Sequence, residues 1–213
     1  MTAGLGPIRN HRRSVLSAFR GGRIVRRAGH ALAIVATLAA GAAITDRTPD
    51  ADTQQHPFIR SATVGHAVDA RTFDVTVLGV RGGAVLGGIS GSHDTSGVWV
   101  LVRMKLDART NPVSLGYAVL EDSDGRTYRA TGRVDQSILG ERSLEPGVPV
   151  IAEIAFEVPT ALAQDMSLRL AVSPTDQRMD AVAQVRLPNT AGQARQWHAD
   201  KNPLTLAAIS VPT

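Results

Sequence analysis

The side chains that could do chemistry are few and are spread along the chain. None of the histidines beyond residue 50 belongs to a His-x-x-x-His or His-Glu pair of the kind that binds zinc; they are His56, His66, His93 and His198. Residues 88–91, Gly-Ile-Ser-Gly, lack the spacing of a nucleophile elbow, and the chain has no Ser-x-x-Lys. We therefore expect surface or turn histidines, no catalytic or metal-binding residue and no cofactor. A triad assembled only in three dimensions is the alternative.

Two groups of carboxylates could bind a metal ion or take part in acid–base chemistry. Residues 122–125, Asp-Ser-Asp-Gly, resemble half of an EF-hand loop, but Arg126 and Arg129 follow closely and would repel Ca²⁺. An Asp-Gly turn between two apolar runs instead predicts a tight hairpin. Glu153 and Glu157 share one face of a predicted strand. They could form a pair for acid–base chemistry, and we favour ordinary solvated strand residues.

Glycine is concentrated in residues 81–97, which hold six of them. The segment lacks the Gly-Lys-Ser/Thr of a phosphate-binding loop, so we expect a flexible connection between strands. Its length also makes it the best candidate recognition loop, with Ser92, His93 and Asp94 at its tip. Trp99 follows, either packed against the edge of a second sheet or exposed as an anchor for a partner. With Trp197, the candidate interaction residues are His93, Asp94 and Trp99.

The elements that would position these residues are strands. Apolar side chains alternate with polar ones in the ranges 73–77, 98–106, 113–119, 150–158, 168–172 and 181–187. Such short strands, separated by turn signals, predict an all-β, immunoglobulin-like antiparallel β-sandwich over residues 58–188. One helical turn is expected at residues 160–165 and nothing longer. Residues 189–213 form a tail that is either disordered or docked on the sandwich with Trp197 as its anchor.

Charge divides the chain. The formal net charge is +4, yet residues 1–45 contain seven Arg and no acidic residue, which leaves 16 basic and 19 acidic residues in 46–213. The uncharged residues 28–45 are long enough to span most of a bilayer. We expect a transmembrane signal anchor there. The alternatives are a cleaved signal peptide with a site at residues 40–42, Ala-Gly-Ala, and a buried core helix.

The anchor interpretation sets a topology. By the positive-inside rule, residues 1–27 form a basic cytoplasmic arm, 46–57 a linker, and the β-domain lies outside the membrane. Cleavage would make the domain a secreted protein. The arm has no aromatic interleaving and no binding fold, so nucleic acid is not an expected partner. With no cysteine, neither a disulfide nor a lipid-modified cysteine is possible.

The order of several motifs resembles a known family. The motifs are residues 64–66, 73–77, 98–106, 121–128, 144–147 and 155–159. Together they resemble bacterial immunoglobulin-like (telokin-like) extracytoplasmic domains of unknown function, and the composition resembles actinobacterial, mycobacterial-type members. The resemblance implies a sandwich fold and a location behind a membrane helix. It implies no catalytic residues.

Function is therefore predicted as a class. We expect a membrane-anchored, non-enzymatic binding or accessory module for another membrane or envelope protein. Small residues four apart in the helix permit close contact with a partner helix; the pairs are Gly29/Ala33, Ala36/Ala40 and Thr37/Gly41. The alternatives are an exported carrier of a small hydrophobic or glycan ligand and an envelope hydrolase.

Overall fold

The computed structural model describes residues 36–39, 55–88, 91–134, 138–140 and 142–212. The chain divides after Gln54, and residues Gln55–Thr213 form a compact unit of their own. Of the predicted anchor, only residues 36–39 are described, and they are helical. Among the described residues, no helix has the length and apolar character needed to cross a membrane. The basic arm and most of the linker lie outside the described residues.

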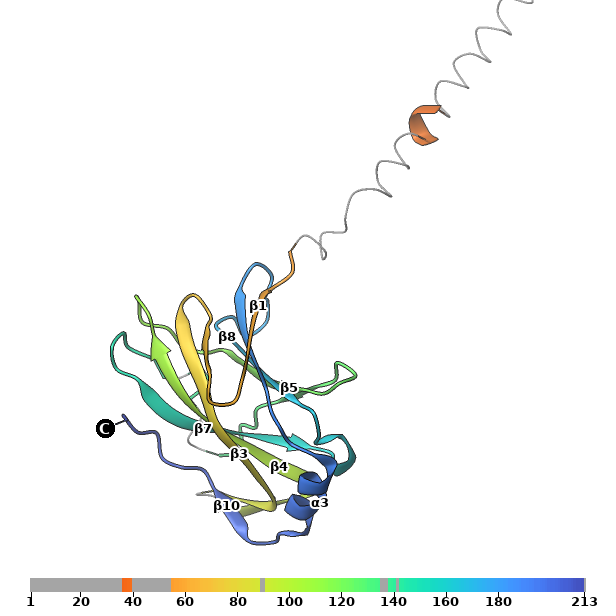
Figure 1. The fold of residues 1–213 in the computed structure, drawn as a ribbon, viewed down its shortest axis with the longest axis vertical. Coiled ribbons are helices and arrows are strands. Elements are labelled where there is room, and N and C mark those ends of the chain that lie inside the picture. Colours follow the sequence, from red (N-terminus) through yellow and green to blue (C-terminus); the bar gives the residue numbers. More distant parts are fainter. Residues whose placement is uncertain (1–35, 40–54, 89–90, 135–137, 141, 213) are drawn as a thin grey trace, which may run out of the picture. The chain divides into compact units, whose positions relative to one another are not determined.

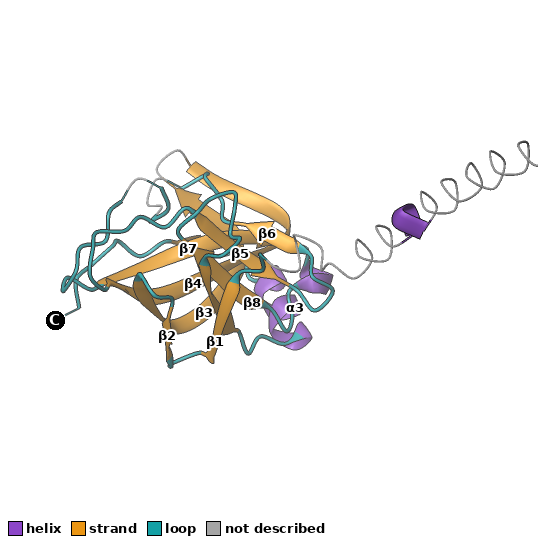
Figure 2. Cartoon of the chain, turned by 90° about the horizontal axis from the view of Figure 1, so that it is seen from above, coloured by secondary structure: helices purple, strands orange, loops and turns teal. Residues whose placement is uncertain are grey.

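Two five-stranded sheets form a β-sandwich (Figures 1 and 2), as the alternation predicts. The first sheet, in spatial order, contains β1 (Phe58–Thr63), β9 (Ala181–Arg186), β8 (Ser167–Ala171), β5 (Tyr117–Glu121) and β6 (Thr127–Arg129). The second contains β10 (Pro203–Thr205), β3 (Phe73–Gly88), β4 (Gly91–Ala108) and β7 (Val150–Val158), with β2 (Ala67–Asp69) also paired to β3.

Most neighbouring strands are antiparallel, as expected, but β1–β9 and β10–β3 are parallel pairs. In both pairs the two strands are far apart in the sequence. The long chain between them allows the strands to run parallel, whereas a tight hairpin would make them antiparallel. The predicted run at 113–119 is shorter as a strand. β5 begins at Tyr117, and Val113 and Leu115 form isolated bridges before it.

The core lies between the two sheets. It is formed by alternate residues of each strand, because successive side chains point to opposite faces of a sheet. Phe73, Met104, Leu120 and Phe156 are fully buried there. Burial of such side chains stabilises the fold by about 1.5–3 kcal/mol each. The predicted helical turn after Pro159 is the 3₁₀ helix η1 (Thr160–Leu162).

The glycine-rich residues are not a loop, and the prediction of a flexible connection is wrong. They are the paired ends of two long strands, with Gly88 opposite Gly91 and Gly83 opposite Trp99. Bulges interrupt the pairing between Val77 and Gly79 and between Gly83 and Val85. Because glycine has no side chain, the segment shows no apolar alternation and resembles a loop in the sequence. In the structure, its backbone N–H and C=O groups are paired between β3 and β4.

The prediction that no longer helix exists is also wrong, because α3 spans Ala191–Ala199. Thr190 and Gln193 form a capping box, in which each side chain satisfies the other residue's backbone N–H. In both views, α3 lies at one end of the sandwich (Figures 1 and 2). Trp197 packs against the core, so the tail is docked, and Trp197 is one of its anchors.

Consecutive glycines let the tail contact both faces of β3. A Cβ atom at Gly82 would lie 2.5 Å from the Trp197 ring, and a Cβ at Gly83 would lie 2.9 Å from the Leu204 side chain. Both distances are shorter than a Cβ atom normally approaches another heavy atom, so a side chain at either position would require its neighbour to shift. Because successive strand residues face opposite ways, Gly82 accommodates the tail on the core side and Gly83 on the outer side.

We expect Gly82→Ala to destabilise the fold by about 1–3 kcal/mol, since the rigid indole ring of Trp197 must shift to admit the methyl group. Gly87→Ala is the matched control in the same strand, because its Cβ would meet only ordinary contacts, the nearest at 3.5 Å. Urea unfolding, followed by circular dichroism, measures both. Equal stability of the two variants would contradict the packing described.

Candidate functional site

Trp99 is fully buried and is not an exposed anchor. It faces away from the main core, as predicted, and belongs to a separate apolar group on the outer face of the second sheet. This outer cluster comprises Leu86, Trp99, Leu101, Val134, Ala155 and Leu206, with Leu204 packed against it. The indole Nε1 of Trp99 donates a hydrogen bond to the His93 carbonyl at 2.9 Å. Trp99 thus packs on the face of its own sheet rather than against the edge of the other.

The chain's own C-terminal segment, residues 203–210, covers the outer cluster. β10 pairs in parallel with residues 85–87 of β3, which places Leu204 over Gly83. Leu206 is 7% exposed within the cluster. Further along, Ser210 exchanges two backbone hydrogen bonds with Ile151 of β7, at 2.7 and 3.1 Å. The segment therefore crosses the sheet from the β3 edge to β7.

An ion pair between the exposed Arg81 and the buried Glu153 holds the backbone of this segment. Two nitrogens of the Arg81 guanidinium donate to the Glu153 carboxylate, at 3.2 and 2.7 Å. Arg81 also donates to the Thr205 carbonyl at 2.7 Å, and the Ala207 N–H donates to Glu153 Oε2 at 2.8 Å. One guanidinium and one carboxylate thus bind a C=O and an N–H two residues apart in an extended peptide.

Glu153 is only 4% exposed, so the expectation of a solvated residue is wrong for it. Burial by itself raises the pKa of Glu153, but the hydrogen bonds from Arg81 and Ala207 outweigh it and hold the pKa below its usual value. The carboxylate is therefore ionised and structural. Glu157 is exposed, as expected, and accepts a hydrogen bond from Thr95 Oγ1 at 2.7 Å.

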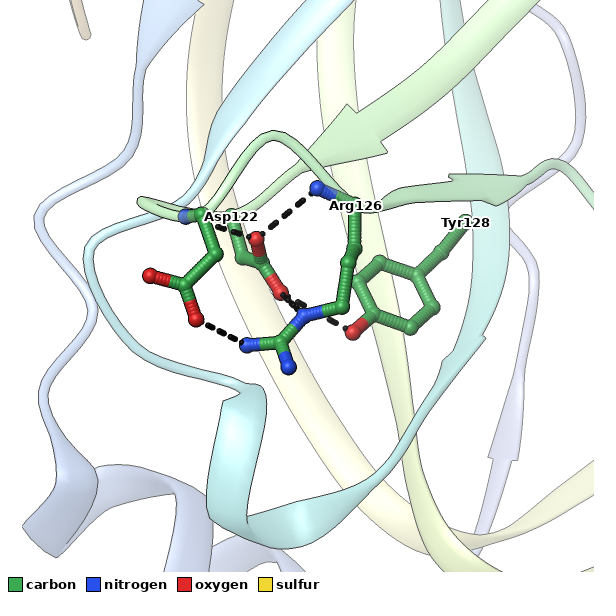
Figure 3. Close-up of polar contacts among 4 residues, drawn as sticks. Asp122, Arg126 and Tyr128 are labelled. Carbon is green, nitrogen blue, oxygen red and sulfur yellow. Dashed lines mark hydrogen bonds and ion pairs between the residues drawn. The ribbon is translucent and has the colours of Figure 1, made fainter.

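The second carboxylate group, at residues 122–125, is a hairpin turn between β5 and β6, as predicted. Figure 3 shows the Asp122 carboxylate facing the Arg126 side chain and the Tyr128 hydroxyl. One oxygen accepts from the N–H groups of Asp124 and Arg126, and the other accepts from Arg126 Nε at 2.7 Å and the Tyr128 hydroxyl at 3.1 Å. Arg126 thus occupies the place that a cation would need.

These contacts set the charge of the turn. Burial acts to raise the pKa of Asp122, but the hydrogen bonds from Arg126, Tyr128 and Asp124 lower it to about 2. Burial and the bond to Asp122 raise the pKa of Tyr128. Across the described part of the chain, no group of three or more His, Cys, Asp or Glu residues is arranged to hold a metal ion.

The remaining candidate residues do not converge on one site. His93 is half-buried and Asp94 is exposed, both in the paired part of β4 opposite Leu86 and Val85. His66 is exposed and hydrogen-bonds to Thr63 Oγ1 through Nδ1 at 3.1 Å. His198, on α3, reaches the Gly97 carbonyl at 2.8 Å. The structure brings His93 and Trp99 together, but Trp197 lies on the other face of the sheet.

Exposed apolar side chains gather at the first strand. β1 is the terminal strand of its sheet, and no other strand in the described ranges pairs with its outer edge. Phe58 is 47% exposed and Ile59 is 45% exposed. Met179, 57% exposed, precedes Asp180, whose carbonyl accepts the Phe58 N–H at 2.8 Å. An unpaired strand edge that carries exposed apolar side chains is a site where another strand can add.

Comparison with known proteins gives no family. No protein-family model matches the chain, and no curated protein matches it. Among solved structures, it is similar to an uncharacterized β-sandwich protein from Clostridium difficile 630. The sequence identity is 10%, the TM-score is 0.41, and the match covers 62% of this chain and 96% of that chain. The β-sandwich assignment rests on the strand pairing described above.

The Asp122 contacts predict a pH-dependent stability. Because the folded-state pKa, about 2, lies below the unfolded-state value of about 3.9, the contribution is complete above pH 5 or so and declines as the pH falls toward 2. Asp122→Asn removes it, since the amide NH₂ would face the donors of Arg126 and Tyr128. The unfolding free energies of wild type and variant, compared from pH 7 to pH 2, should converge in acid. Asp124→Asn, which alters only an exposed ion pair, should cost less at pH 7.

Proposed function

We propose that this protein is a membrane-tethered, extracytoplasmic, non-enzymatic module that binds another protein of the cell envelope. Residues 28–45 serve as the tether, and the basic arm keeps the N-terminus in the cytoplasm. We place the sandwich among immunoglobulin-like (telokin-like) extracytoplasmic domains on the order of its sequence motifs. The tether and the family assignment rest on the sequence alone.

The observation that carries the binding role is the β1 edge. It offers unpaired backbone groups together with exposed Phe58 and Ile59, and it begins directly after the linker. An extended segment of a partner can add to such an edge through backbone hydrogen bonds, with its side chains contacting the apolar residues. We therefore propose a partner that presents an extended, partly apolar strand close to the membrane surface.

The chemistry of the carboxylates supports a non-enzymatic role. A general acid at neutral pH needs a raised pKa, whereas arginine hydrogen bonds lower the pKa of both Asp122 and Glu153. These two residues stabilise a turn and the C-terminal segment. His66 and His198 hydrogen-bond to a threonine hydroxyl and a backbone carbonyl.

A pocket of about 430 Å³ favours a second candidate function, the binding of a small polar ligand such as a glycan. It is lined by Thr63, Asp165, Arg186 and Asn189, among others. Asn189 is 3% exposed, and its Oδ1 has no hydrogen-bond partner among the described residues. If the pocket binds glycans, a neutral disaccharide should shift the NMR signals of these residues selectively; unchanged spectra at millimolar sugar would rule this function out.

Co-purification tests the binding role. The full chain, extracted in mild detergent, should retain a membrane or envelope protein, and Ile59→Lys should reduce that protein's recovery about tenfold or more, because charge on an edge strand opposes strand addition. Val148→Lys is the matched control: Val148 is 46% exposed and Ile59 is 45% exposed. A partner retained equally by both variants would exclude the β1 edge, and no partner for the wild type would exclude the binding role.

Sequencing the N-terminus of the protein recovered from cells tests the tether separately. An anchored protein should begin at or near Met1 and fractionate with membranes. A new N-terminus close to residue 42 would instead show that residues 28–45 are a cleaved signal and that the domain is secreted.

A further inference from the structure

We propose that the outer cluster, with Arg81 and Glu153, is a binding site for an extended polypeptide, and that a second copy of this chain supplies the occupant by exchanging residues 203–210. In the single chain these residues occupy the site themselves. The site lies on the outer face of the second sheet, so the proposal is independent of the β1 edge.

The site recognises both the backbone and the side chains of its occupant. Arg81 donates to the Thr205 carbonyl, and Glu153 accepts the Ala207 N–H. Between these two contacts, Leu206 fills the cluster formed by Trp99 and Leu101. Apolar residues two positions apart on an extended chain, as at 204 and 206, are therefore what the site requires.

The segment is held within its own chain by contacts of three kinds. β10 contributes three residue pairs at a sheet edge, Arg81 and Glu153 bind the backbone of Thr205 and Ala207, and Ser210 exchanges two hydrogen bonds with Ile151. Leu206 is the one buried residue among 203–210. The connection from α3 is Asp200, Lys201 and Asn202, of which the last two are exposed. Local release of a short segment with a single buried residue costs less than global unfolding.

Release leaves a surface that favours being covered again. It exposes Trp99, Leu86 and Leu101, an apolar patch of the kind that drives association. Glu153 keeps both of its bonds to Arg81, so release does not strand an unpaired buried charge. The segment of a second copy reproduces every contact, and mutual exchange gives a closed, two-fold symmetric pair.

The lack of cysteine makes a crosslinking test specific. A Cβ added at Gly87 would lie 3.5 Å from Thr205 Oγ1, in ordinary contact, so cysteines at these two positions can form a disulfide. The double variant Gly87→Cys/Thr205→Cys should link within one chain and shows that the geometry is right. Single variants carrying different tags, Gly87→Cys on one and Thr205→Cys on the other, can join these positions only between chains.

The full-length single variants are mixed in mild detergent, incubated and oxidised, and the 87–205 linkage between chains is quantified by peptide mass spectrometry. Exchange should give about tenfold more linkage than random collision, because the cysteines are held together at high effective concentration. A mixture of Ser123→Cys and Thr205→Cys measures random collision, since Ser123 lies on an exposed turn. Adding Leu206→Asp to the Thr205→Cys chain should abolish the excess.

The proposal is overturned if the double variant links internally while the mixture gives no more 87–205 linkage than the Ser123→Cys control. Hydrogen exchange of the Ala207 amide shows whether the segment opens during the incubation. A protected amide without linkage overturns the proposal equally, because the segment then stays in its own chain.

Discussion

The structure depends on the pairing of β3 with β4. These are the longest strands, Phe73–Gly88 and Gly91–Ala108, and they pair along almost their whole length. The inner face of the pair contributes a large part of the main core, including Phe73 and Met104. Its outer face forms the second cluster around Trp99. Its two edges bind β7 on one side and β2 and β10 on the other, so every element of the second sheet is positioned by this one hairpin.

Two carboxylates taken out of water are stabilised in the same way. Asp122 and Glu153 are each bound by an arginine and by one or more backbone N–H groups. Together these donors keep the acid ionised despite its burial. In each case the carboxylate adds to backbone pairing between two segments: the two sides of the β5–β6 turn for Asp122, and the C-terminal segment with β3 for Glu153. The two charged groups therefore fix the paths of the segments that they bind.

Much of the fold could be predicted because the strands follow from the alternation of apolar and polar residues. The positions of β7, β8 and β9 agree closely with the apolar periodicity, and the Asp124-Gly125 turn was indicated by its residue types. β4 agrees over residues 98–106 but begins seven residues earlier, at Gly91. What could not be predicted depends on contacts distant in sequence. No local pattern shows that Glu153 meets Arg81, 72 residues away, or that residues 203–210 cover the outer face. Two local signals did exist: Trp99 and Leu101 make β4 apolar on both faces, and Thr190-x-x-Gln193 is a capping box.

The C-terminal segment also affects when the domain can finish folding. β1 can pair only after β9 has been synthesised, and the outer cluster is covered only after residues 203–210 have been synthesised. Both contacts therefore depend on residues that are made late. Folding from such distant contacts is slow, and it cannot be completed before residues 203–210 have been synthesised. A chain that stops before residue 203 would leave the face around Trp99 uncovered. Incomplete chains would thus carry an exposed apolar surface that chaperones and proteases can recognise.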